Sequence, residues 1–138
     1  LKWVINLHPG KDIKALDFFA GSGTTGAALL ELNKEDGGTR SYVLCTNNEI
    51  SDARAMQYLM ESGLIIGKTK KELLTSYKVY QETKEYKEWL QSDHYESLGI
   101  CKSVTYERLR KVIEGYTTPK GKEIAGLDGN LSYYKIVK

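Results

Sequence analysis

Apolar residues in the first third of the chain are grouped as expected for a strand, a helix and a second strand. Residues 13–20 form a short apolar run between a charged turn and a glycine-rich loop, which is typical of a buried parallel strand. Good helix formers fill residues 24–32, and Gly37 and Gly38 end that segment. Residues 41–46 are rich in β-forming types. The pattern predicts two parallel strands joined by a right-handed crossover helix.

The segments around this unit are predicted to be mainly helical. Residues 1–7 have near-helical apolar spacing and are followed by Pro9, so we expect the tail of a helix there. Residues 51–98 are predicted to form a helical insertion of two or three helices. In this insertion Lys78 is spaced to pair with Glu82, and Lys84 with Glu88, on a solvated face, and we assign the insertion no chemistry.

The last third is predicted to contain one helix and one strand. Ser103 can cap a helix that runs to Gly115, and its apolar face is expected to pack on the sheet. Three basic residues fall largely away from that face: Arg108, Arg110 and Lys111. Residues 131–137 are a candidate third strand after a turn. The expected fold class is therefore α/β.

The loop after the first predicted strand carries the strongest signal for a ligand site. Gly21, Gly23 and Gly26 have the spacing G-x-G-x-x-G between a strand and a helix, which is the context that a nucleotide-binding loop requires. Glycine at the first two positions lets the backbone turn sharply, and the free N–H groups of the helix start point towards a ligand. The loop is suited to a polar or anionic group.

Side chains near the loop narrow the choice of ligand. Thr24 and Thr25 add hydroxyls at the helix start, and Asp17 places a carboxylate at the strand end. A carboxylate suits the ammonium group of a methionine moiety and repels a pyrophosphate. Glu49 follows the second strand about 20 residues beyond the last glycine, where an acid can accept both ribose hydroxyls of an adenosine. A first-turn helix acid is the alternative interpretation of Glu49.

The loop sequence resembles that of a known family. Residues 16–25, LDFFAGSGTT, are similar to the cofactor-binding motif of DNA adenine-N6 and cytosine-N4 methyltransferases. The phrases LNKEDGG at 32–38, TNNE at 46–49, VTYER at 104–108 and VIEGY at 112–116 resemble the modification (Mod) subunits of type III restriction–modification systems. The resemblance implies a partial Rossmann-like S-adenosylmethionine-dependent methyltransferase fold, with an incomplete parallel sheet and flanking helices.

The same resemblance implies a set of cofactor-binding residues. Asp17 would neutralise the amino group of S-adenosylmethionine, residues 21–25 would hold its carboxylate, and Glu49 its ribose. Asn47 and Asn48 are candidates to border the adenine, although asparagines are common in such turns. The implied cofactor-binding residues are Asp17, Phe18, Phe19, Ala20, Gly21, Ser22, Gly23, Thr24, Thr25, Asn48 and Glu49.

The sequence lacks the residues that perform methyl transfer in this family. Their motif, Asp-Pro-Pro-Tyr or a close variant, precedes the glycine loop, whereas the two prolines here are the separated Pro9 and Pro119. We assign no catalytic residue. Residues 1–138 are interpreted as the C-terminal cofactor-binding fragment of a longer methyltransferase, inactive alone and directed to adenine-N6 in preference to cytosine-N4.

Composition and charge add limits to this interpretation. The chain is 41% hydrophobic and 28% charged, which is typical of a folded domain, and its formal charge of +2 is too small to indicate nucleic-acid binding. Cys45 and Cys101 have neither metal-ligand nor disulfide spacing, which fits a reducing cytoplasm and no metal. We expect no membrane association, because neither a long apolar span nor a signal peptide is recognisable.

The resemblance implies DNA, a restriction subunit and a second copy of the full-length enzyme as partners. One alternative is an NAD(P)-binding Rossmann fragment of an oxidoreductase, which shares the glycine spacing and a following acid. The residues 19–25, FAGSGTT, argue against it. Another alternative is a non-catalytic module in which Arg108, Arg110 and Lys111 contact DNA or a partner, with a solvated helix face as the simpler explanation.

Overall fold

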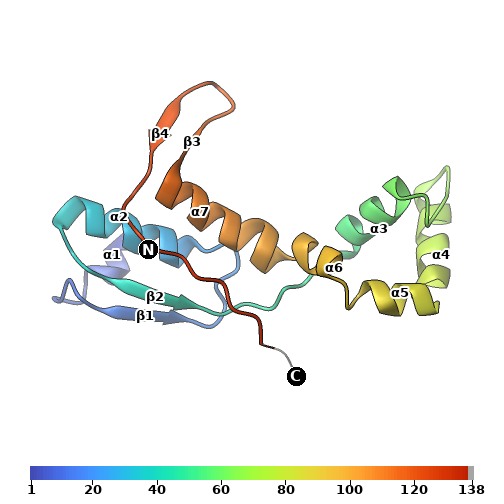
Figure 1. The fold of residues 1–138 in the computed structure, drawn as a ribbon, viewed down its shortest axis with the longest axis horizontal. Helices are drawn as coiled ribbons and strands as arrows, with labels where there is room; N and C mark the ends of the chain where they lie inside the picture. The colour runs from blue at the N-terminus through green and yellow to red at the C-terminus, as the bar shows by residue number, and fades with distance from the viewer. Residues whose placement is uncertain (137–138) are drawn as a thin grey trace. The chain divides into compact units, whose positions relative to one another are not determined.

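A computed structural model describes residues 1–136 and divides the chain into two compact units. The sheet unit comprises residues 1–47 together with the chain from Ile100 onwards. The helical unit is Asn48–Gly99. Figure 1 labels the elements of both units, and each unit is described by itself. Among the described residues, no helix is long and apolar enough to cross a membrane.

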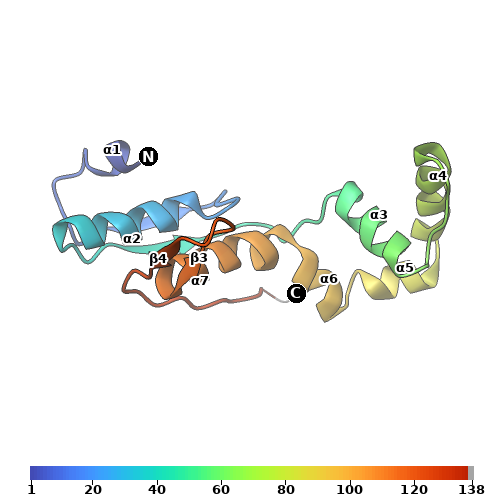
Figure 2. The ribbon, with the colours of Figure 1, turned by 90° about the horizontal axis from the view of Figure 1, so that it is seen from above.

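The sheet unit is mixed α/β with a small parallel sheet. Its elements are α1 (Lys2–Ile5), β1 (Lys14–Asp17), α2 (Thr24–Asp36), β2 (Ser41–Leu44), a π-helical turn η1 (Cys101–Tyr106), α7 (Glu107–Glu114), β3 (Gly115–Thr117) and β4 (Glu123–Ala125). Strands β1 and β2 are parallel, in the register Lys14 to Ser41 through Asp17 to Leu44. The predicted strand, helix and parallel strand are thus confirmed, and α2 covers one face of the pair (Figures 1 and 2).

Both strands are shorter than predicted, because the chain turns immediately after Asp17. The Asp17 carboxylate accepts a hydrogen bond from Phe19 N, which bends the backbone away from the strand direction. Backbone pairing nevertheless continues: Cys45 N donates to Asp17 O at 2.7 Å and Ala20 N donates to Cys45 O at 3.1 Å. These bonds tie the glycine loop to the end of β2.

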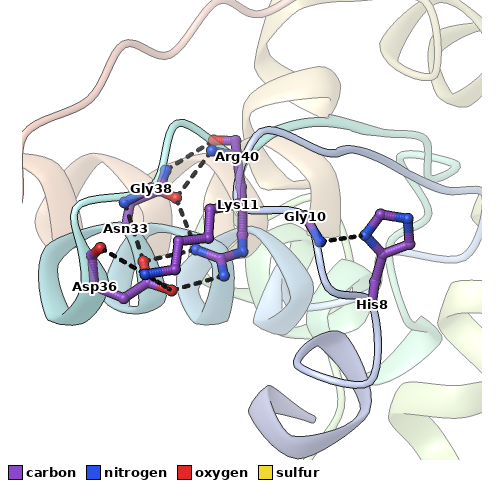
Figure 3. A network of polar contacts seen from close by, with 7 residues as sticks. All are labelled: His8, Gly10, Lys11, Asn33, Asp36, Gly38 and Arg40. Atoms are coloured by element: carbon purple, nitrogen blue, oxygen red, sulfur yellow. Dashed lines mark hydrogen bonds and ion pairs between the residues drawn. The ribbon is translucent and has the colours of Figure 1, made fainter.

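Helix α2 ends where the sequence predicts. Gly37 follows its last turn with φ of +69°, and its N–H donates to Asn33 O at 2.9 Å. Beyond it, the buried Arg40 binds both carboxylate oxygens of Asp36 at 2.8 and 2.9 Å, and its backbone exchanges two hydrogen bonds with the Asn33 side chain (Figure 3). The Arg40 guanidinium lowers the pKa of Asp36 to about 2. This network fixes the turn from α2 into β2.

The N-terminal connection joins the same network. Lys11 donates to the backbone oxygen of Asp36 at 3.2 Å, and Gly10 N donates to Nδ1 of His8 at 3.0 Å (Figure 3). Helix α1 is linked to α2 by Lys2, whose Nζ lies 2.6 Å from carboxylate oxygens of both Glu31 and Glu35. The expected N-terminal helix tail is therefore present and lies against α2.

The C-terminal predictions need two corrections. Ser103 does not cap a helix, because it lies inside η1, and the α-helix proper begins at Glu107. Residues 131–136 are not a strand, and Val137 lies outside the described residues. A strand needs a hydrogen-bonded neighbour, and the two small sheets of the described residues contain only β1 with β2 and β3 with β4. The antiparallel hairpin of β3 and β4 was not predicted.

Helix α7 packs on α2 through one buried leucine. Leu109 is 2% exposed, and a Cβ at position 26 would lie 2.9 Å from its Cδ2 and 3.1 Å from Cδ1 of Leu44. The absence of a side chain at Gly26 therefore lets Leu109 reach the interface of α2 and β2. This helix was predicted to pack on the sheet. It packs instead on α2, and Leu109 also comes close to Leu44 of β2.

The helical unit contains four helices rather than two or three. They are α3 (Asp52–Glu61), α4 (Lys70–Gln81), α5 (Lys84–Trp89) and α6 (Asp93–Leu98). Their N-caps are Ser51, Thr69, Thr83 and Ser92, each accepting a backbone N–H. Thr83 and Ser92 divide the charged stretch into separate helices. The core of this unit is Ala55, Leu59, Ile65 and Tyr77, and the predicted Lys84–Glu88 pair forms at 3.2 Å on its exposed surface.

Candidate ligand-binding loop

The glycine loop has the backbone that its sequence predicts. Gly21 and Gly23 have φ of +49° and +78°, in the left-handed region that L side chains rarely adopt. Gly23 is the N-cap of α2 and its N–H donates to Ala20 O at 2.8 Å, while no side chain caps the helix. The N–H groups of the first turn of α2 have no intrahelical acceptor. The loop therefore presents backbone donors at a helix start, as an anion-binding loop does.

Asp17 is held beside this loop as a carboxylate. Its Oδ2 accepts from Thr25 Oγ1 at 2.6 Å, and its Oδ1 accepts from Phe19 N at 3.0 Å. The Thr25 hydroxyl first, and the Phe19 amide second, lower the pKa of Asp17. The group is consequently ionised at neutral pH, with lone pairs left on both oxygens for a further donor.

Segment η1 covers the loop through Thr105. The Thr105 hydroxyl donates its one hydrogen to Gly21 O, and its oxygen also lies 3.3 Å from Ile100 O; the residue is 5% exposed. A Cβ at position 23 would lie 3.1 Å from Thr105 Cγ2 and 3.5 Å from its carbonyl oxygen. Glycine at position 23 thus satisfies two demands at once, a positive φ and a close neighbour.

One turn further along, Arg108 reaches the same loop. Its Nη1 donates to Ser22 Oγ at 2.9 Å and to Thr24 Oγ1 at 3.1 Å. These two hydroxyls lie 3.2 Å from each other. In contrast, Arg110 is paired within its own helix, with Glu107 at 2.9 Å and Glu114 at 2.6 Å. The two arginines therefore occupy different electrostatic environments.

The predicted site residues belong to both units of the structure. Residues 17–25 run from the end of β1 through the loop into the first turn of α2, and Phe18 and Phe19 are exposed while Ala20 is buried. Asn48 and Glu49 begin the helical unit, and Asn48 Nδ2 donates to Glu96 O at 2.7 Å. Glu49 lies two residues before Ser51, the N-cap of α3, and is therefore not a first-turn helix acid.

Thr105 and Arg108 are contacts of the loop that the sequence did not reveal. They are more than 80 residues from the loop, so that no local pattern connects them to it. Their spacing of three places them on one helical face, which is the signal that was available. The resemblance of residues 104–108 to Mod subunits does not indicate what this segment contacts.

Comparison with known proteins finds similarity to DNA methyltransferases of restriction–modification systems. It is 59% identical over 46 residues to the StyLTI Mod subunit, a type III restriction–modification enzyme of Salmonella typhimurium, covering 33% of this chain and 7% of that protein. It is 29% identical over 115 residues to the EcoPI Mod subunit of Escherichia phage P1, covering 83% and 17%. It is 49% identical over 45 residues to the type II methyltransferase M.KpnI of Klebsiella pneumoniae, covering 33% and 11%.

The chain matches only 7–17% of the length of these curated relatives. No family profile matches it. No solved structure matches it either. The resemblance inferred from the glycine loop is nevertheless confirmed, since these relatives are two type III Mod subunits and a type II methyltransferase, each similar to this chain over part of its length.

Proposed function

We propose that this chain is the S-adenosylmethionine-binding part of a site-specific DNA methyltransferase, with adenine-N6 as the favoured target. The observation that carries the proposal is the loop of residues 17–25, in which an ionised carboxylate lies beside uncapped helix donors. A zwitterionic amino acid moiety needs both charges within one small site. The parallel β1–α2–β2 unit supports a partial Rossmann-like arrangement around this loop.

Each end of the cofactor is assigned to different residues. Asp17 receives the ammonium group, and the first-turn N–H groups of α2 with the Ser22 and Thr24 hydroxyls receive the carboxylate. Phe18 and Phe19 offer exposed apolar surface at the strand end, and buried Ala20 shapes the turn. In the helical unit, Glu49 is assigned to the ribose and Asn48 to the border of the adenine.

We propose that these residues bind the cofactor and that residues outside this sequence perform the methyl transfer. The bound cofactor supplies a methyl group activated by its positively charged sulfur. The chain's residues hold and orient that group, and the target base must leave the duplex stack to reach it. Since the Asp-Pro-Pro-Tyr motif is lacking, residues 1–138 are proposed to bind cofactor without transferring methyl by themselves.

The wider organisation is proposed by analogy with the relatives. Residues 1–138 form a C-terminal cofactor-binding fragment, and residues 51–98 are a helical insertion within it, for which the compact unit at Asn48–Gly99 is the support. DNA, a restriction subunit and a second copy are the proposed partners of the full-length cytoplasmic enzyme. The exposed, register-paired Leu16 and Val43 on the open face of the sheet support a larger domain that covers them.

A nicotinamide dinucleotide is the weaker ligand for this loop. Its pyrophosphate would lie beside the ionised Asp17, and like charges disfavour that position. Calorimetric titration of the chain with S-adenosylmethionine, S-adenosylhomocysteine and NAD separates the two functions. We expect the first two to bind and NAD to give no heat.

Two variants give this titration its controls. Gly23→Asp adds a carboxylate and a strained residue where the cofactor carboxylate is placed, so binding should be lost. Gly37→Ala tests a left-handed glycine at the other end of the same helix, where nothing lies within 4 Å, and should bind normally. NAD binding, or no S-adenosylmethionine binding in a sample with native circular dichroism, would contradict the proposal.

A further inference from the structure

Arg108 is a positive charge at the glycine loop that no described carboxylate neutralises. Within residues 1–136, which the structure describes, it forms no ion pair, and its two hydrogen bonds go to the neutral hydroxyls of Ser22 and Thr24. A guanidinium carries five N–H donors in a planar fork. Only Nη1 is engaged here, so Nη2 and Nε retain donors for a further acceptor.

The comparison with Arg110, two residues along the same helix, shows that this is specific to position 108. Arg110 uses Nε, Nη1 and Nη2 on Glu107 and Glu114, which leaves it fully committed within the helix. Both side chains carry the same charge, but only Arg108 is directed at the loop. The Thr105 hydroxyl anchors the preceding turn on Gly21 O and so fixes the distance from which Arg108 extends.

The hydroxyls that Arg108 holds are also oriented by it. When a hydroxyl oxygen accepts from a guanidinium, its own hydrogen is turned away to find another acceptor. Ser22 Oγ and Thr24 Oγ1 lie 3.2 Å apart, so one of them can donate to the other and the second still has a hydrogen to offer. Arg108 therefore brings a positive charge to the loop, which complements the negative charge of Asp17. It also orders a hydroxyl donor there.

We propose that Arg108 is the residue that recognises the α-carboxylate of the cofactor's methionine moiety, acting with the Ser22 and Thr24 hydroxyls that it holds. This inference rests on the proposed binding of S-adenosylmethionine and names the group that selects its amino acid end. Arg108 and Asp17 then form a complementary pair of charges for a zwitterion. A planar guanidinium whose Nε and Nη2 donors are free suits a carboxylate.

The test compares S-adenosylmethionine with decarboxylated S-adenosylmethionine, which lacks only the carboxylate. Both ligands are titrated into the chain and into the variants Arg108→Gln and Arg110→Gln. Loss of a charge-assisted hydrogen bond should weaken S-adenosylmethionine binding to Arg108→Gln by roughly 10-fold or more. The affinity of the same variant for the decarboxylated ligand should change by less than about twofold. Arg110→Gln should retain the wild-type ratio of the two affinities.

Each alternative gives a different result. If Arg108 only stabilises the loop, Arg108→Gln weakens both ligands equally, and the proposal is overturned. If Arg108 plays no part, both affinities stay at the wild-type level, and the proposal is again overturned. If the wild-type chain binds neither ligand, the cofactor assignment itself fails. This outcome differs from the other two, because no ratio of the two affinities can then be measured. Arg108→Lys keeps the charge without the fork and should recover part of the lost affinity.

Discussion

The two left-handed glycines at the ends of α2 allow backbone strain to be separated from close packing. Gly23 and Gly37 have φ of +78° and +69°, so alanine should be strained to a similar extent at both. Their surroundings differ. A Cβ at position 37 meets nothing within 4 Å, whereas one at position 23 lies 3.1 Å from Thr105 Cγ2. We expect Gly23→Ala to destabilise the sheet unit more than Gly37→Ala.

The expected difference follows from two contributions. A non-glycine residue in the left-handed region costs about 1–2 kcal/mol, of which roughly 0.4–1 kcal/mol is returned by the lower entropy of the unfolded chain. Gly37→Ala should therefore lower the free energy of unfolding by about 1 kcal/mol. At position 23, overpacking adds roughly 1–3 kcal/mol. Thr105 is buried and its hydroxyl is bonded to Gly21 O, so it cannot turn aside without losing that bond. Gly23→Ala should cost about 3 kcal/mol.

Hydrogen–deuterium exchange of the α2 amides in the two variants measures this difference. About 2 kcal/mol corresponds to roughly 30-fold faster exchange in Gly23→Ala than in Gly37→Ala. Amides of α3 and α4 in the helical unit serve as the internal reference and should be unchanged. Equal exchange rates in the two variants would refute the reasoning, because they would show that Thr105 does not restrict position 23.

Three further outcomes are expected. Leu109→Ala, which empties the space beside Gly26, should destabilise the sheet unit by about 3 kcal/mol in urea unfolding; a cost below about 1 kcal/mol would contradict the packing of α7 on α2. Asp36 has a lowered pKa in the folded chain, so its stabilisation is present above its unfolded pKa of about 4 and is lost as the pH falls towards 2. Acid titration of Asp36→Asn should lack that step, and an unchanged acid profile would exclude the Arg40 pair as its origin. Thr105→Val should cost about 1 kcal/mol and Thr105→Ser less, because only serine keeps the hydroxyl bonded to Gly21 O; the reverse order in thermal unfolding would assign the effect to the methyl group.

Local patterns were sufficient for the strand, loop and helix that contain the proposed site. These patterns determine backbone conformation and capping directly, so their effect extends over only a few residues. They are the apolar run before Asp17, the glycines at 21 and 23, and the helix end at Gly37. The family resemblance rests on the same short segment. The sequence also predicts that residues 51–98 are helical, although it underestimates the number of helices because the Thr83 and Ser92 caps interrupt a uniformly charged stretch.

Only the tertiary structure shows what packs on the glycine loop. Thr105 and Arg108 meet residues 84 to 86 positions away, and no periodicity in either segment records that contact. The apolar spacing of residues 131–136 resembles a strand but does not become one, because a strand exists only where another supplies its hydrogen bonds. The sequence by itself determines the local conformation of the segment from β1 through the glycine loop to α2, and the resemblance of this chain to DNA methyltransferases. Contacts between distant segments decide which side chains surround its proposed ligand, since such contacts depend on the whole packed unit.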